Sequence, residues 1–200
     1  MKKIKLAAAT VLLALGAMPA LAQEAPRPIY VGIALGQAHA KRLCADATVA
    51  CDERSGATRY FAGYQFHRNF GVEASYTNLE RFNTGGTVAG TPVSGNIDGK
   101  IGDLVAVAAW PVVRELSVYG KAGLYHASMS GSANVGGSQS DTTGTNNNWT
   151  VGAGAQLNAG RFGVRAEFQR FHDVHGGTAG GVRLTPGDID VWSLGVLVRF

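Results

Sequence analysis

The sequence predicts an all-β protein, an eight-stranded antiparallel up-and-down barrel that spans a membrane. Three observations predict it: alternation of apolar and polar residues in eight segments, alternation of short and long connections, and the final strand. Counting back from Phe200 in twos gives an apolar face with an aromatic residue at each end, formed by Phe200, Val198, Val196, Leu194 and Trp192. The residues between them are small, polar or charged apart from Leu197. A membrane barrel needs such strands, because its outer face meets lipid and its interior is polar.

Each of the eight segments has one apolar face and one polar or small face. They cover residues 29–38, 58–66, 70–79, 100–110, 116–127, 148–157, 162–172 and 188–200. Period-two alternation over this length is typical of a strand buried on one face. In chain order, their apolar faces carry Ile33 and Leu35, Tyr60 and Tyr64, Phe70 and Tyr76, Leu104 and Trp110, Val118 and Leu124, Trp149 and Leu157, Phe162 and Phe168, and Trp192 and Leu194. Segment 100–110 is the least regular, and we assign its faces by placing Asp103 inside.

The connections between the segments alternate in length. Residues 67–69, 111–115 and 158–161 form tight turns, whereas the remaining connections are long and rich in Gly, Ser, Thr, Asn and Asp, at 39–57, 80–98, 128–147 and 173–187. Short turns on one side and long loops on the other are typical of an outer-membrane barrel with its termini in the periplasm. We therefore expect four extracellular loops.

A soluble eight-stranded barrel such as a lipocalin is the main alternative fold, and it would reverse the pattern. The charged residues of the strands would then face water, and the cavity would have to hold many aromatic side chains, including Trp110, Trp149 and Trp192. These aromatic residues instead lie near predicted strand ends, as in the two interfacial girdles of a membrane barrel. The pattern therefore favours the membrane barrel.

The first 22 residues predict a secretory signal peptide, and residues 23–200 form the barrel domain. Lys2, Lys3 and Lys5 precede an apolar run that ends in an Ala-Leu-Ala cleavage site at residues 20–22. This run is too short to span a bilayer comfortably. Removing the signal peptide lowers the formal net charge from +4 to +1, so the charge gives no argument for a nucleic-acid partner.

The chain contains two cysteines, Cys44 and Cys51. In an exported chain we expect them to form a disulfide. A metal site is the weaker interpretation, because the spacing is not C-x-x-C and His39 has no obvious companion.

Two stretches resemble the transmembrane family of outer-membrane protein A (OmpA). The run Tyr-Phe-Ala-Gly-Tyr-Gln-Phe-His-Arg-Asn-Phe-Gly-Val-Glu-Ala-Ser-Tyr at residues 60–76 resembles that family's second hairpin. Arg-Ala-Glu-Phe-Gln at residues 165–169, with Ser-Leu-Gly-Val and Arg-Phe near the carboxy terminus, resembles its last two strands. The resemblance extends over about residues 27–200, although the Cys44–Cys51 pair departs from the best-known member.

The resemblance implies a small barrel of the Gram-negative outer membrane. Phe200 would then be the aromatic signal that the barrel assembly machinery reads after periplasmic chaperones deliver the chain. Lipid and lipopolysaccharide would surround the barrel, and a host or surface ligand could bind the loops. Because the chain stops at Phe200, we expect no peptidoglycan-binding domain.

Six charged residues are expected inside the barrel: Arg59, Glu73, Asp103, Lys121, Arg165 and Glu167. Buried charges must be paired, and an eight-stranded barrel is just wide enough for its own side chains to fill. By resemblance, Glu73, Lys121 and Arg165 match a salt-bridge network described as a gate, but Gln156 stands where that network would carry an acid. A polar plug that closes the barrel is the first interpretation, and a narrow, porin-like pore of low conductance is the alternative.

An enzymatic role is the remote alternative. Some eight-stranded lipid A deacylases use a lipid-facing His-x-Ser pair, and His126 and Ser128 would share a face. No acid is placed to orient the histidine, so we expect no catalytic residues. His172-Asp173-x-His175 is interpreted as a solvated loop, and we expect no metal or other cofactor. The sequence therefore predicts a structural barrel that acts through its surface loops.

Overall fold

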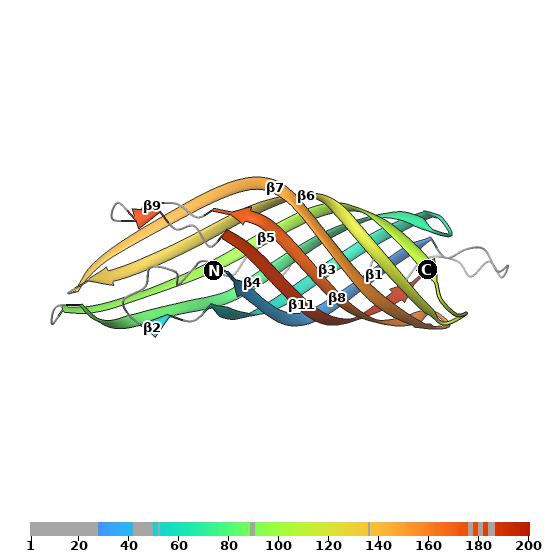
Figure 1. Ribbon diagram of the computed structural model, residues 1–200, viewed down its shortest axis with the longest axis horizontal. Coiled ribbons are helices and arrows are strands. Elements are labelled where there is room, and N and C mark those ends of the chain that lie inside the picture. The colour runs from blue at the N-terminus through green and yellow to red at the C-terminus, as the bar shows by residue number, and fades with distance from the viewer. Residues whose placement is uncertain are drawn as a thin grey trace, which may run out of the picture.

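Eight long antiparallel strands form one closed barrel in the part of the chain that the structure describes (Figure 1). This computed structural model describes residues 28–41, 50–51, 53–88, 91–135, 137–175, 178–179, 182–183 and 187–200. The long strands are β1 (Ile29–Ala40), β3 (Arg54–His67), β4 (Phe70–Val88), β5 (Thr91–Pro111), β6 (Leu116–Val135), β7 (Ser138–Ala159), β8 (Phe162–Val174) and β11 (Gly187–Arg199). Three short strands accompany them: β2 (Ala50–Cys51), β9 (Thr178–Ala179) and β10 (Val182–Arg183).

The barrel closes where its first strand pairs with its last. β1 and β11 run antiparallel from the pair Tyr30–Arg199 to the pair Ala40–Ile189. Each other long strand pairs with its neighbour in the chain, so the order is up-and-down as predicted. Closure matters in a bilayer, since an open edge would leave backbone N–H and C=O groups unpaired in lipid.

The two ends of the barrel differ. One end, which we call the turn end, carries the predicted short connections at residues 68–69, 112–115 and 160–161. The opposite end carries the tips of the β4–β5 and β6–β7 hairpins, and we call it the hairpin end (Figure 1). No helix in the described ranges is long and apolar enough to cross a membrane.

Two of the predicted long loops are instead regular β-hairpins. Residues 80–98 belong mostly to β4 and β5, which pair as far as Val88 and Thr91, and residues 128–147 belong mostly to β6 and β7. We call these four strand extensions the extramembrane sheet; at its base, Phe82, Ile97 and Met129 are buried in the barrel. The sequence prediction was wrong here because it searched for an apolar face, and Ser138–Asn148 of β7 carries almost none. A strand with water on both faces needs no such alternation.

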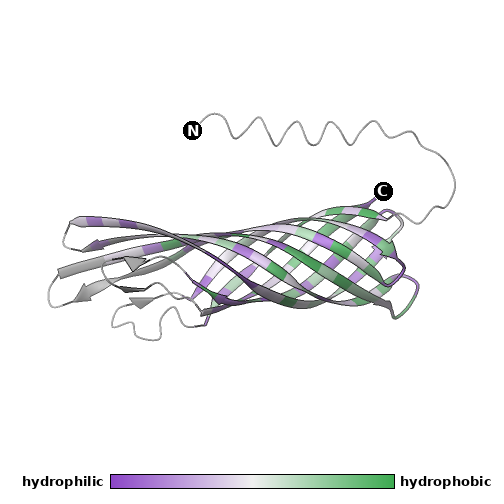
Figure 2. Ribbon diagram, turned by 90° about the horizontal axis from the view of Figure 1, so that it is seen from above, coloured by the Kyte–Doolittle hydropathy of each residue, from purple (hydrophilic) through white to green (hydrophobic). Residues whose placement is uncertain are grey.

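The outer surface of the barrel is apolar, as predicted. Apart from Val112 and Val113 in a turn, the large hydrophobic side chains that are exposed are those assigned to the outer face, including Leu35, Leu124 and Trp192. In β5, Leu104 is 63% exposed whereas Asp103 is 6% exposed, so the face chosen for segment 100–110 is right. Figure 2 shows hydrophobic residues concentrated toward the turn end, and more hydrophilic residues toward the hairpin end.

Candidate functional site

The barrel interior brings together the six charged residues predicted to lie inside it. All six side chains are buried, and three carboxylates face three cations, so the group is formally neutral. They come from β3, β4, β5, β6 and β8, and closure of the barrel brings their inward side chains together. We call this group the charged layer.

Glu167 on β8 has the most partners in the charged layer. Its Oε1 lies 2.7 Å from Arg59 Nη1 and 2.5 Å from Lys121 Nζ. Its Oε2 accepts a hydrogen bond of 2.6 Å from the Tyr119 hydroxyl and lies 3.7 Å from Arg165 Nη1. One carboxylate therefore contacts three cations, which lie on β3, on β6 and on β8 itself. These contacts fix the interior side chains relative to one another.

Glu73 on β4 has a similar role nearer the turn end. Arg165 Nη1 donates to Glu73 Oε2 over 2.6 Å, and the Tyr30 hydroxyl donates to the same oxygen over 2.8 Å. Lys121 Nζ and Arg59 Nη2 lie 3.7 and 3.5 Å from Glu73 Oε1. Both oxygens of this buried carboxylate thus have charged or polar partners, as burial requires.

Asp103 on β5 completes the charged layer toward the hairpin end. Ser75 Oγ donates to its Oδ2 over 2.6 Å, and Gln169 Nε2 donates to the same oxygen over 3.3 Å. Arg59 Nη2 lies 3.5 Å from Asp103, while Arg59 Nη1 also donates to the Gln169 side chain. Ser75 and Gln169 were not among the predicted site residues, although both stand at inward positions of their strands.

Glycines make room for the tyrosines of the charged layer. A Cβ atom on Gly63 would lie 2.1 Å from Tyr30 Cζ, and one on Gly154 would lie 2.4 Å from the Tyr119 hydroxyl oxygen. The two tyrosine rings occupy the space that these missing side chains leave. These two glycines therefore leave room for the hydroxyl groups that bind Glu73 and Glu167.

An apolar cluster fills the barrel between the charged layer and the hairpin end. We call it the apolar seal; its largest members, Phe82, Ile101, Met129, Phe171 and Ile189, are each at most 2% exposed. The Tyr125 and Phe171 rings meet edge to face, with centroids 5.4 Å apart. The sequence predicts mainly small, polar or charged inward residues, and it does not predict this apolar cluster. The apolar seal could have been found by extending the inward positions of β8 from Gln169 to Phe171.

Arg165 lies on the side of the charged layer that faces the cavity at the turn end. Its guanidinium lies over the rings of Phe61 and Tyr119, with centroid distances of 4.6 and 4.7 Å. Its Nε and Nη2 donate to Gln156 Oε1 over 3.2 and 3.0 Å. Gln156 stands at the position where the family gate would carry an acid. It supplies Arg165 with a neutral hydrogen-bond acceptor in place of a carboxylate.

His126 and Ser128 lie on the outer face of β6, near the hairpin end. The His126 ring nitrogen Nδ1 is 2.6 Å from Asn147 Oδ1, so the partner that the structure gives this histidine is an amide. An amide cannot supply the negative charge that a catalytic acid provides to a histidine base. This geometry gives the pair no support as a hydrolytic site.

The other candidate sites of the sequence have ordinary structural partners. His172 stacks on Trp149 with ring centroids 3.6 Å apart, and His175 Nε2 lies 3.1 Å from Asp173 Oδ1. Within the described ranges, no group of three or more His, Cys, Asp or Glu residues could hold a metal ion.

Some sequence predictions fall outside the described residues. Cys44 and the segment 1–22 lie there, so the disulfide with Cys51 and the signal peptide remain predictions. Phe200 is described, at the turn end, where its backbone N–H donates to the carbonyl of Ile29 on β1. Its role in assembly likewise remains a prediction.

Comparison with known proteins agrees with this geometry. A family model described as the outer membrane protein beta-barrel domain matches residues 7–200. No curated protein sequence matches the chain.

Three solved structures have a similar fold. The attachment invasion locus protein Ail of Yersinia pestis has a TM-score of 0.51 at 18% identity, covering 86% of this chain and 97% of that chain. The N-terminal β-barrel domain of Pseudomonas aeruginosa OprF has a TM-score of 0.53 at 17% identity, covering 86% of this chain and 98% of that chain. Neisserial surface protein A has a TM-score of 0.50 at 18% identity, covering 86% and 97%.

Proposed function

We propose that the barrel is a closed support for the sheet that it displays outside the membrane. The chain belongs to the outer membrane protein beta-barrel domain family. The protein would act by contact between the extramembrane sheet and molecules outside the cell, without conducting solutes and without catalysis. A signal peptide at residues 1–22 would direct its export, and chaperones and the barrel assembly machinery would insert it among lipid and lipopolysaccharide.

The filled interior supports a closed barrel. The apolar seal lies on the hairpin side of the charged layer, so a polar solute would have to pass both. Moving an ion past buried Phe82 and Phe171 would remove its hydration without replacing it. This observation carries the proposal and favours it over the narrow pore.

Planar bilayers test the closed state. We expect purified protein to give no steady single-channel current, because buried apolar side chains form the apolar seal. Replacing both rings, Phe82→Ala with Phe171→Ala, is expected to produce small currents by opening a gap above the charged layer. Large, steady currents from the unaltered protein would support the pore instead.

The extramembrane sheet supports a role in surface contact. It continues strands β4 to β7 past the lipid-facing band, and β7 from Ser138 to Asn148 is largely exposed (Figure 2). Its β6–β7 portion, residues 128–147, contains Asp141 as its one charged residue. We therefore infer recognition by hydroxyl and amide hydrogen bonds rather than by charge. Ail has been crystallised with the heparin analogue sucrose octasulfate, but residues 128–147 carry no Lys or Arg for such an anion.

Shortening one hairpin tests this role. Ser130 pairs with Thr143, so replacing residues 131–142 with Asn-Gly should leave the membrane-spanning strands intact. Bacteria that express the shortened protein are expected to lose most of the attachment to host cells or matrix that the full protein confers. That attachment should change little with salt. The control replaces residues 86–93 with Asn-Gly between the paired Gly85 and Ser94, and heat-modifiable gel migration checks that both variants fold. Equal attachment by full-length and both shortened proteins would reject the proposal.

A further inference from the structure

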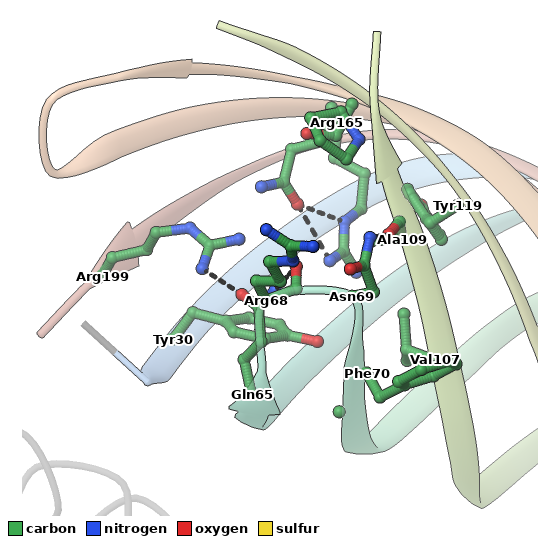
Figure 3. Close-up of a pocket in the computed structure, with 14 residues that line it drawn as sticks. Tyr30, Gln65, Arg68, Asn69, Phe70, Val107, Ala109, Tyr119, Arg165 and Arg199 are labelled. Atoms are coloured by element: carbon green, nitrogen blue, oxygen red, sulfur yellow. Dashed lines mark hydrogen bonds between the residues drawn. The ribbon is translucent and has the colours of Figure 1, made fainter. Parts of the chain in front are cut away.

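A cavity of about 90 Å³ opens inside the turn end of the barrel, below the charged layer (Figure 3). Three arginines line it: Arg68 from the turn between β3 and β4, Arg165 from β8 and Arg199 from β11. The described residues that line the cavity include no aspartate or glutamate. Arg165 is paired with Glu73 of the charged layer, whereas the described walls of the cavity supply no carboxylate for Arg68 or Arg199.

The carboxylates of the charged layer are already engaged, and Arg165 is one of their cationic partners. Glu73 and Glu167 each contact Arg59, Lys121 and Arg165, and Asp103 is held by Ser75, Gln169 and Arg59. Within the described part of the chain, the structure shows no ion pair for either Arg68 or Arg199.

Arg199 is held in place while most of its hydrogen-bonding capacity is unused. Its Nη1 donates to Gln65 Oε1 over 2.9 Å, and its guanidinium lies 5.3 Å from the centroid of the Tyr30 ring (Figure 3). Arg165 lies at the same distance from the Tyr30 centroid, so both cations lie against one aromatic ring. A guanidinium has five N–H donors in a planar fork that fits the oxygens of a phosphate or carboxylate.

We propose that this cavity binds a phosphate group through Arg199 and Arg165, with Arg68 at its entrance. A tetrahedral oxyanion has a size that suits the cavity, and it would supply the negative partner that Arg199 and Arg68 lack. The partly buried position strengthens the attraction relative to bulk water. The phosphate would come from free inorganic phosphate or from the head group of a phospholipid at this end of the barrel. This inference is independent of the function proposed for the extramembrane sheet.

Nuclear magnetic resonance tests binding of the free anion. The chain from residue 23 to Phe200, folded in maltoside micelles that contain no phosphate, is titrated with inorganic phosphate at constant ionic strength set by sodium chloride. We expect saturable shifts of the Nε–Hε signals of Arg199 and Arg165. Loss of a charge-assisted hydrogen bond should weaken binding about tenfold or more in Arg199→Gln. Arg68→Gln, at an exposed turn, is expected to weaken binding as well.

Arg161→Gln is the matched control, since Arg161 is an exposed arginine at the same end that does not line the cavity. It removes the same charge and should leave phosphate binding unchanged. Heat-modifiable migration confirms that each variant is folded.

Native mass spectrometry distinguishes the lipid source. Protein in maltoside is mixed with phosphatidylglycerol or with diacylglycerol, which shares the acyl chains but lacks phosphate. Preferential retention of phosphatidylglycerol that is lost in Arg199→Gln and kept in Arg161→Gln identifies the head group as the ligand. Saturable phosphate shifts without lipid retention identify the free anion. The proposal is overturned if neither ligand binds, or if Arg161→Gln loses binding as much as Arg199→Gln does.

Discussion

Lys121 shows how tightly individual residues of the charged layer depend on one another. Its ammonium group is fully buried and lies against Glu167 and Glu73, two carboxylates that would otherwise have only Arg59 and Arg165 as cationic partners. Replacing a complete buried ion pair with apolar groups is often neutral, whereas removing one partner leaves an uncompensated charge. The layer is therefore a specific arrangement in which each member requires the others.

Lys121→Met is expected to destabilise the folded barrel by about 3 kcal/mol, because it keeps the length of the side chain and leaves a net negative charge in the interior. Urea unfolding of the protein in lipid vesicles, followed by tryptophan fluorescence, measures the change in the free energy of unfolding. Lys100→Met is the control, since Lys100 is exposed on β5. A loss of stability no larger than that of the control would mean that Arg59 and Arg165 compensate the two carboxylates without Lys121.

At the scale of the element, β6 shows that close strand packing leaves little room on the inner wall. A Cβ atom at Gly123 would lie 2.1 Å from the backbone oxygen of Leu104 on β5, whereas one at Gly120 would have the oxygen of Gly152 as its nearest neighbour, at 4.0 Å. The neighbour at Gly123 is backbone and cannot rotate away. On β6, the neighbouring strands thus leave no room for a side chain at Gly123, whereas they leave room for one at Gly120.

Gly123→Ala is expected to destabilise the barrel by about 1–3 kcal/mol, the usual cost of adding a methyl group to a filled interior. Gly120→Ala should have almost no effect. The two variants are compared by urea unfolding and by the fraction that regains heat-modifiable migration after refolding. If both variants behave alike, β5 and β6 separate more easily than the contact distances imply.

At the scale of the whole molecule, the barrel consists of layers stacked between its two ends. From the turn end these are the arginine-lined cavity, the charged layer and the apolar seal, with the extramembrane sheet beyond them. Closure by the β1–β11 pairing holds the layers in one register. Assembly must therefore bring the last strand, with Phe200 at its end, against the first.

Phe200→Ala is expected to lower the amount of assembled barrel in the outer membrane, because it removes the terminal aromatic residue that we predict the assembly machinery reads. Outer-membrane fractionation with and without boiling measures the assembled fraction. Phe162→Ala removes a ring of the same kind from the outer face at the turn end, where Phe162 is 66% exposed. This control variant should assemble normally. Equal assembly of both variants would remove Phe200 as a signal.

The sequence by itself determined the barrel, its strand order and which face of each strand meets lipid. It could do so because the bilayer imposes an apolar face on every spanning strand, and this pattern is local in the sequence. It also selected Arg59, Glu73, Asp103, Lys121, Arg165 and Glu167 as inward residues. Only the tertiary structure decided which of them meet, since contacts such as Arg59–Glu167 join residues 108 positions apart through closure of the barrel. The extramembrane sheet also required the structure, because residues 138–148 of β7 are largely exposed and have no apolar face to mark a strand.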